Sequence, residues 1–107
     1  MPITSKYTIP LFAGMLLCLS AQADTVSPER AEMLAGSCAN CHGTEGRLSG
    51  AVPALAGRPA STLETMLLSF KYEDNANVTV MDRIARGYSD AELAALADYF
   101  ASIDDRN

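Results

Sequence analysis

The sequence contains no tryptophan, a single histidine and three cysteines among its 107 residues. Basic residues are also scarce: eight lysines and arginines stand against thirteen aspartates and glutamates, for a formal net charge of −5. Because binding to nucleic acid requires an excess of positive charge, we expect no nucleic-acid partner. The length accommodates one small domain and excludes a two-domain enzyme. No segment alternates between apolar and polar residues, which favours an all-α fold.

Many of the apolar residues lie at the N-terminus, where residues 1–23 have the features of a secretory signal peptide. Lys6 provides the positive charge, residues 9–19 form the apolar stretch, and small residues mark a cleavage site after Ala23. Crossing a membrane takes about 20 apolar residues, roughly twice this stretch, so we expect cleavage rather than retention as an anchor.

The mature chain is therefore predicted to be a periplasmic domain of residues 24–107 without a membrane span. A lipoprotein would be acylated at Cys18, but Leu17 is bulky where such signals prefer a small residue. Without the leader two cysteines remain, Cys38 and Cys41, and the net charge becomes −6. Fourteen of the remaining apolar residues are alanines, which bury little area each. So thin a core indicates that a disulfide, a metal or a cofactor helps to fill the centre.

Capping signals and apolar periodicity predict three main helices. They span residues 27–37, 61–72 and 89–103, with a Gly- and Pro-rich loop over 43–60 and a short helical turn over 82–86 that ends at Gly87. Ser61 and Ser89 each begin a capping box. Met66 and Phe70 share the apolar stripe of the second helix, and we assign both to the core, with cofactor contact as the alternative.

Residues 38–42, Cys-Ala-Asn-Cys-His, have the C-x-x-C-H spacing of covalent haem attachment. Two thiols one helical turn apart can add to the two vinyl groups of one porphyrin edge, and the adjacent imidazole can bind the iron. Export agrees with this chemistry, because bacteria attach haem covalently outside the cytoplasm. We therefore predict one haem c held by Cys38 and Cys41, with His42 as an iron ligand.

Three other interpretations of this motif explain less. A thioredoxin-like redox pair belongs before a helix in a βαβ unit, whereas this motif closes a helix in a chain without predicted strands. A closed zinc site needs four nitrogen or sulfur ligands, and the mature chain offers two cysteines and one histidine. A structural disulfide fits an exported protein but leaves His42 and the thin core unexplained.

With a single histidine, the sixth iron ligand must be another side chain, a water or an exchangeable small molecule. Met33 lies on the same helix as the motif and cannot reach the opposite haem face, and Met66 fits the core. Met81 follows a polar loop, 39 residues after His42, and can fold over the distal face. Thioether ligation leaves no open site and raises the reduction potential, which suits electron transfer. The alternative is that Met81 is an ordinary buried residue.

A family resemblance extends beyond the haem motif. Its stretches are residues 38–44, residues 53–57 (Pro-Ala-Leu-Ala-Gly), residues 81–90 (Met-Asp-Arg-Ile-Ala-Arg-Gly-Tyr-Ser-Asp) and residues 96–100 (Leu-Ala-Asp-Tyr-Phe). Together they resemble class I c-type cytochromes of the c4/c553 group. Residues 79–90 are most similar to the cytochrome subunit of flavocytochrome c sulfide dehydrogenase in its single-haem form. The second C-x-x-C-H motif of two-haem relatives is absent from the sequence.

The resemblance implies a class I cytochrome c fold around one haem, with thioether bonds to Cys38 and Cys41 and with His42 and Met81 as axial ligands. It also implies that the Pro53 carbonyl accepts a hydrogen bond from the histidine ring. The chain would not itself be an enzyme: a FAD-containing flavoprotein partner would oxidise sulfide, and a downstream redox protein would take the electrons. The alternatives are a free periplasmic electron carrier and a ligand-binding or peroxidatic haem protein.

Overall fold

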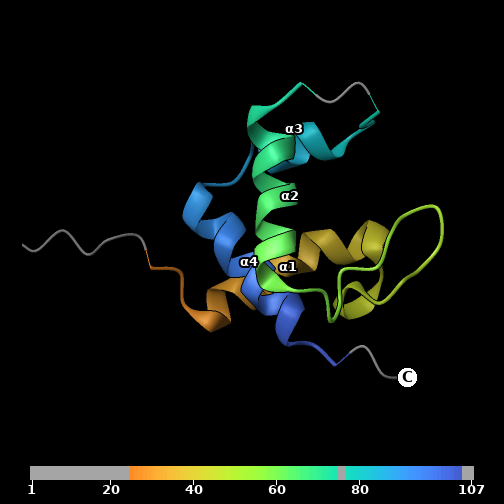
Figure 1. The fold of residues 1–107 in the computed structure, drawn as a ribbon. Coiled ribbons are helices and arrows are strands. Elements are labelled where there is room, and N and C mark those ends of the chain that lie inside the picture. The colour runs from red at the N-terminus through yellow and green to blue at the C-terminus, as the bar shows by residue number, and fades with distance from the viewer. Residues whose placement is uncertain (1–24, 75–76, 105–107) are drawn as a thin grey trace, which may run out of the picture.

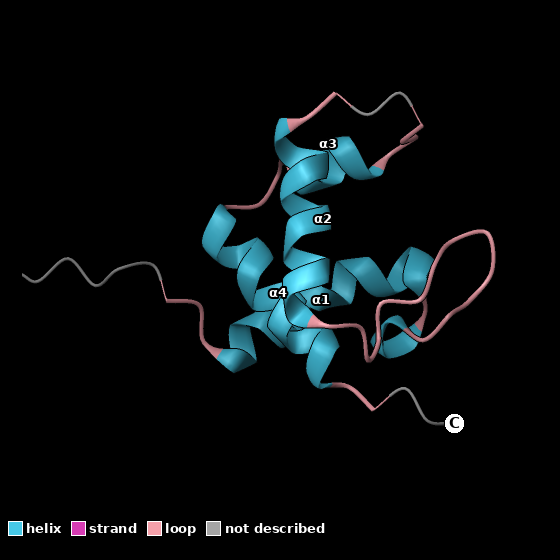
Figure 2. Cartoon of the chain, viewed as in Figure 1, coloured by secondary structure: helices cyan, strands magenta, loops and turns pink. Residues whose placement is uncertain are grey.

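The computed structural model describes residues 25–74 and 77–104, and this part of the chain is helical (Figure 2). Its elements are α1 (Pro28–His42), the short 3-10 helix η1 (Thr44–Gly46), α2 (Ala60–Tyr72), α3 (Met81–Ala85) and α4 (Asp90–Ser102). The described residues contain no strand, so the predicted all-α fold is confirmed. The predicted signal peptide lies outside the described residues.

Helix α4 packs against both α1 and α2, and α2 also contacts α3. Figure 1 shows α2 upright, with α3 at one end and α1 and α4 at the other, while the segment between η1 and α2 forms a wide loop at the side. The buried core comes from three helices: Ala35, Leu63, Leu93, Leu96, Ala97 and Phe100. Cys38 packs against this cluster, so the core fixes the part of α1 that carries the C-x-x-C-H motif.

Two predicted helix starts are confirmed by their side-chain caps. The Ser27 hydroxyl accepts a hydrogen bond from the Arg30 amide at 3.2 Å, at the start of α1. At α4 the capping box is complete, because Ser89 Oγ accepts from the Glu92 amide (3.1 Å) and Glu92 Oε1 accepts from the Ser89 amide (3.0 Å). The hydrogen bond from the Ser89 amide is the largest cause that holds the pKa of the Glu92 carboxyl below its usual range.

The predicted capping box at Ser61 is wrong. Helix α2 begins one residue earlier, and Pro59 is its N-cap without a side-chain hydrogen bond. The Pro59 carbonyl accepts from the amides of Thr62 and Leu63, both at 3.1 Å, so Ser61 lies inside the first turn and cannot cap it. Proline is well suited to a helix start because its φ is fixed and it needs no amide partner.

Helix α1 continues five residues beyond its predicted end at Ser37. Gly36 lies exposed within the helix and does not interrupt it. The helix ends at Gly43, whose φ of 83° favours glycine and whose amide donates to the Ala39 carbonyl at 3.0 Å. The whole haem motif therefore lies within the helix.

The short helical turn before α4 also differs in detail from the expectation. Helix α3 begins at Met81, one residue early, and its C-cap is Arg86 rather than Gly87. The Gly87 amide donates to the Ile84 carbonyl at 3.0 Å as an ordinary turn.

The assignment of Met66 to the core is wrong, since this residue is 37% exposed, and Phe70 is only half-buried. The core-facing side of α2 runs through Leu63, Leu67 and Leu68, which turns Met66 outward.

Candidate haem site

The cysteines of the C-x-x-C-H motif lie in the last turns of α1. Cys38 is half-buried and Cys41 is exposed, and the two sulfurs are not joined in a disulfide. Burial raises the pKa of the Cys38 thiol and outweighs a hydrogen bond involving Ser37, which lowers it. Cys38 therefore remains a neutral thiol at neutral pH. Both sulfurs are available for thioether bonds.

His42, the last residue of α1, is 6% exposed and the only polar residue buried in the described part of the chain. Its Nδ1 lies 2.7 Å from the Pro53 carbonyl oxygen, which is the contact that the family resemblance implies. A carbonyl oxygen can only accept, so Nδ1 carries the proton and Nε2 keeps its lone pair for a metal. The hydrogen bond thus selects both the tautomer and the orientation of the ring.

The loop that carries Pro53 is held in place by Gly46. The Gly46 carbonyl accepts from the amides of Leu55 (2.7 Å) and Ala56 (3.1 Å). Its backbone adopts a φ of 69°, and a Cβ at this position would lie 2.9 Å from the ring of Phe100. Glycine is required here because the backbone approaches a core aromatic ring in a left-handed conformation. The core therefore positions the oxygen that orients His42.

Met81 occupies the first position of α3 and is half-buried. Beside it, Asp82 Oδ1 is buried without a hydrogen-bond partner among the described residues, while Oδ2 lies 4.0 Å from Arg86. Met33 is 81% exposed on α1, the helix that also carries the haem motif. The structure thus gathers Cys38 and His42 at one end of α1, while Met81 belongs to a separate helix that packs against α2.

The residues present fit a porphyrin. Large apolar side chains near the motif, on α2 and on both sides of Met81 are more than one-third exposed: Leu48, Met66, Val80 and Ile84. Covering such surface is favourable, and a porphyrin is large and apolar enough to do so. Within residues 25–74 and 77–104, no group of three or more His, Cys, Asp or Glu side chains could hold a metal ion. The motif itself offers two thiols for the porphyrin edge and one imidazole for the iron, which are the groups that covalent haem attachment uses.

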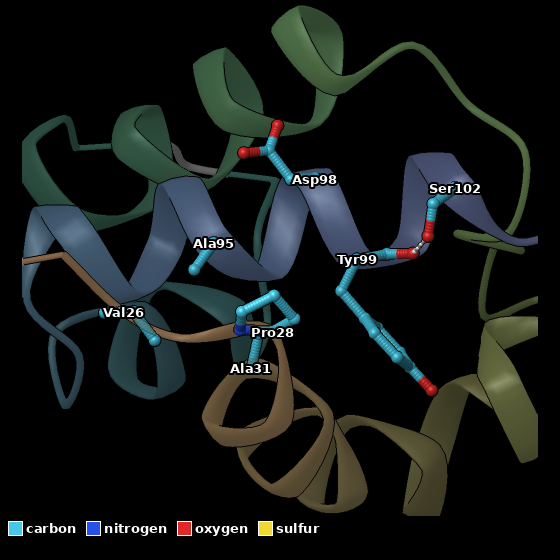
Figure 3. A pocket seen from close by; sticks show the side chains of 7 residues that line it. All are labelled: Val26, Pro28, Ala31, Ala95, Asp98, Tyr99 and Ser102. Carbon is cyan, nitrogen blue, oxygen red and sulfur yellow. Dashed lines mark hydrogen bonds between the residues drawn. The ribbon is translucent and has the colours of Figure 1, made fainter.

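A pocket of about 290 Å³ lies away from the motif, between the start of α1 and the outer face of α4. In Figure 3, Ala95 and Tyr99 of α4 point toward the side where Pro28 and the segment that enters α1 lie, whereas Asp98 points away from it. The lining residues are Val26, Pro28, Ala31, Ala95, Asp98, Tyr99 and Ser102. Burial raises the pKa of the Tyr99 hydroxyl, with smaller contributions from the charges of Glu32 and Glu45. None of the predicted haem-site residues lines this pocket.

Two features of the structure escaped the sequence analysis, the place of Gly46 against Phe100 and the contact of Tyr88 with Ser37. The glycine-rich loop is a signal that some position needs special backbone geometry, but only the packing against Phe100 identifies Gly46. Tyr88 lies inside a stretch used for the family resemblance, yet its partner Ser37 is 51 residues away in the sequence.

Among the described helices, none combines the length and the apolar character needed to span a membrane.

Comparison with known proteins identifies the family. The cytochrome c family model matches residues 29–104. The chain is 39% identical over 82 residues to the cytochrome subunit of sulfide dehydrogenase from Chlorobaculum tepidum, covering 77% of this chain and 74% of that protein. It is 34% identical over 70 residues to cytochrome c-554(548) from Halomonas halodenitrificans, covering 63% of this chain and 84% of that protein. It is also 39% identical over 69 residues to a thiosulfate dehydrogenase electron acceptor from Stutzerimonas stutzeri, covering 62% of this chain and 32% of that protein. The chain therefore belongs to the cytochrome c family, as a class I c-type cytochrome that carries electrons on covalently bound haem c.

Proposed function

We propose that this cytochrome is the electron-accepting haem subunit of a flavocytochrome c sulfide dehydrogenase, working in the periplasm after cleavage behind Ala23. The observation that carries the proposal is the 39% identity to the Chlorobaculum tepidum cytochrome subunit of sulfide dehydrogenase, over 77% of this chain. Sulfide oxidation would reside on a FAD-containing flavoprotein partner. This chain would accept the electrons one at a time and deliver them to a downstream redox protein.

The chain would hold its haem through four side chains. Cys38 and Cys41 would form the thioether bonds, and His42 Nε2 and the Met81 thioether would bind the iron. When bound, haem c supplies one-electron exchange between ferrous and ferric iron. The hydrogen bond from His42 Nδ1 to the Pro53 carbonyl, 2.7 Å long, would keep the imidazole oriented and make it a more basic ligand for the iron.

Two observations support Met81 as the sixth ligand. It is a half-buried methionine on α3, outside the helix that carries His42, whereas the highly exposed Met33 lies on that same helix. It is also flanked by Val80 and Ile84, which are 47% and 38% exposed and suited to contact with a large apolar group. A filled sixth position keeps small ligands from the iron, and this favours outer-sphere electron transfer over oxygen or peroxide chemistry.

Purification of the native protein tests the partner. We expect the cytochrome to elute with a second subunit that carries flavin absorbance, and we expect sulfide to reduce the haem of this complex faster than that of the recombinant cytochrome alone. A native protein that elutes alone at monomer size, without flavin absorbance, would contradict the subunit role and favour a free electron carrier. Rapid binding of carbon monoxide to the reduced native protein would instead indicate an open site and a ligand-binding or peroxidatic protein.

A further inference from the structure

Helix α3, which carries Met81, has little to stabilise it by itself. It is five residues long, and its N-cap, Val80, makes no side-chain hydrogen bond. Within the helix only Ala85 is buried. A helix of this length does not persist in water without tertiary contacts, because nucleation costs more than so few hydrogen bonds return. The place of Met81 therefore depends on the packing of α3 against α2 and on what holds the segments on either side of α3.

The segment that follows α3 is attached to α1 through Tyr88. The Tyr88 hydroxyl lies 2.7 Å from Ser37 Oγ, and Ser37 Oγ donates to the Leu34 carbonyl at 3.0 Å. Because the serine proton is used in that second bond, the tyrosine is the donor in the first. The Tyr88 ring packs against the buried core cluster, which fixes the direction of its hydroxyl.

This contact joins the two halves of the proposed iron site. Ser37 immediately precedes Cys38 on α1, and Tyr88 follows α3 after only two intervening residues. Helix α1 does not need the bond for its own backbone, because Ser37 is an exposed position in a continuous helix. The bond therefore constrains the relative position of α1 and α3 more than the stability of either helix.

We propose that Tyr88 is a positioning residue for the sixth iron ligand, acting through its hydrogen bond to Ser37. The proposal rests on the proposed ligation by Met81. When the bond is present, the segment after α3 is held against the helix that carries the thioether cysteines, and Met81 stays within reach of the iron. When the bond is absent, α3 moves more freely and the thioether leaves the iron more often.

The test is imidazole binding to the ferric holoprotein, since imidazole can bind the iron only after Met81 has left it. Loss of one partly exposed hydrogen bond should raise the equilibrium constant for dissociation of the Met81 thioether from the iron by about 2- to 5-fold. The apparent affinity for imidazole should rise by the same factor. Tyr88→Phe keeps the packed ring and Ser37→Ala keeps the helix, so both should show this increase. The double variant should match either single variant, because both remove the same bond.

Two further variants separate a positioning role from general stabilisation. Ser37→Thr keeps the hydroxyl that Ser37→Ala removes, and it should bind imidazole with the native affinity. Tyr72→Phe is the matched control, because it removes a tyrosine bond to Asp90 (2.7 Å) while Lys71 keeps its own 2.7 Å contact with the same carboxylate. We expect Tyr72→Phe to bind imidazole as the native protein does.

The positioning role is overturned if Tyr88→Phe and Ser37→Ala lower the unfolding midpoint but leave imidazole affinity unchanged. It is equally overturned if their effects on affinity multiply in the double variant, or if Tyr72→Phe raises affinity as much as Tyr88→Phe does. Failure of the underlying ligation has a different signature: Met81→Ala would then bind imidazole with the native affinity. The two failures are thus distinguishable in one titration series.

Discussion

Replacing Gly46 by alanine should destabilise the holoprotein through two separate costs. The first is backbone strain, because an L-residue at a φ of 69° costs roughly 1–2 kcal/mol. The second is overpacking: the new Cβ would lie 2.9 Å from the ring of Phe100, which is 3% exposed and has no room to move. Overpacking a core typically costs about 1–3 kcal/mol. We therefore expect a loss of about 2–5 kcal/mol, measured by guanidinium unfolding followed by circular dichroism.

The Gly46→Ala substitution should also change the reduction potential of the haem iron. The Gly46 carbonyl holds the amides of Leu55 and Ala56, so a shift of Gly46 moves the loop that presents the Pro53 oxygen to His42. We expect the reduction potential of Gly46→Ala to differ from that of the native protein. Gly36→Ala is the matched control, since its Cβ would meet nothing within 4 Å on an exposed helical site and should stabilise by about 0.8–1.0 kcal/mol. A Gly46→Ala protein within 0.5 kcal/mol of the native stability would refute the reasoning.

Two predictions concern the start of α4. Ser89→Ala removes an observed cap and should cost about 1 kcal/mol in urea unfolding, whereas Ser61→Ala, at a position that caps nothing, should cost less than about 0.5 kcal/mol; equal losses would contradict the assignment of the caps. The Asp90 carboxylate accepts from Lys71 and Tyr72, which hold its pKa below the usual range, so its contribution is present above roughly pH 4 and is lost as the pH falls through the lower folded-state pKa. Thermal unfolding of Asp90→Asn should therefore begin at a lower temperature than that of the native protein at pH 7 and converge with it at about pH 2; a difference that does not change with pH would refute this.

Local signals in the sequence predicted the helices and their order. Ser27 and Ser89 cap their helices as predicted, because the capping bonds form between residues three apart and depend on nothing distant. Ser61 has the same pattern, but the Pro59 carbonyl takes the first helical hydrogen bonds and a proline start competes successfully with the serine. The predicted end of α1 at Ser37 is five residues early, because a single exposed glycine such as Gly36 costs only about 1 kcal/mol and the helix continues to His42, with Gly43 as its C-cap.

The parts of the site that depend on tertiary packing were less accessible from the sequence. Spacing alone was enough to single out Cys38 and Cys41, whereas the contact between His42 and Pro53 required a family resemblance. Met66 follows an apolar period that does not distinguish a core position from one that faces outward, and it is exposed. The bond between Tyr88 and Ser37 joins residues with no local relation, so only the folded chain reveals it.

The absorption spectrum of the ferric protein shows whether Met81 is the sixth iron ligand, as we propose. The native protein should show the weak sulfur-to-iron band near the red end of the visible spectrum. Met81→Ala should abolish this band, and Met66→Ala should retain it, because Met66 lies on α2 and would serve only as an apolar contact. Loss of the band in Met66→Ala with retention in Met81→Ala would contradict ligation by Met81.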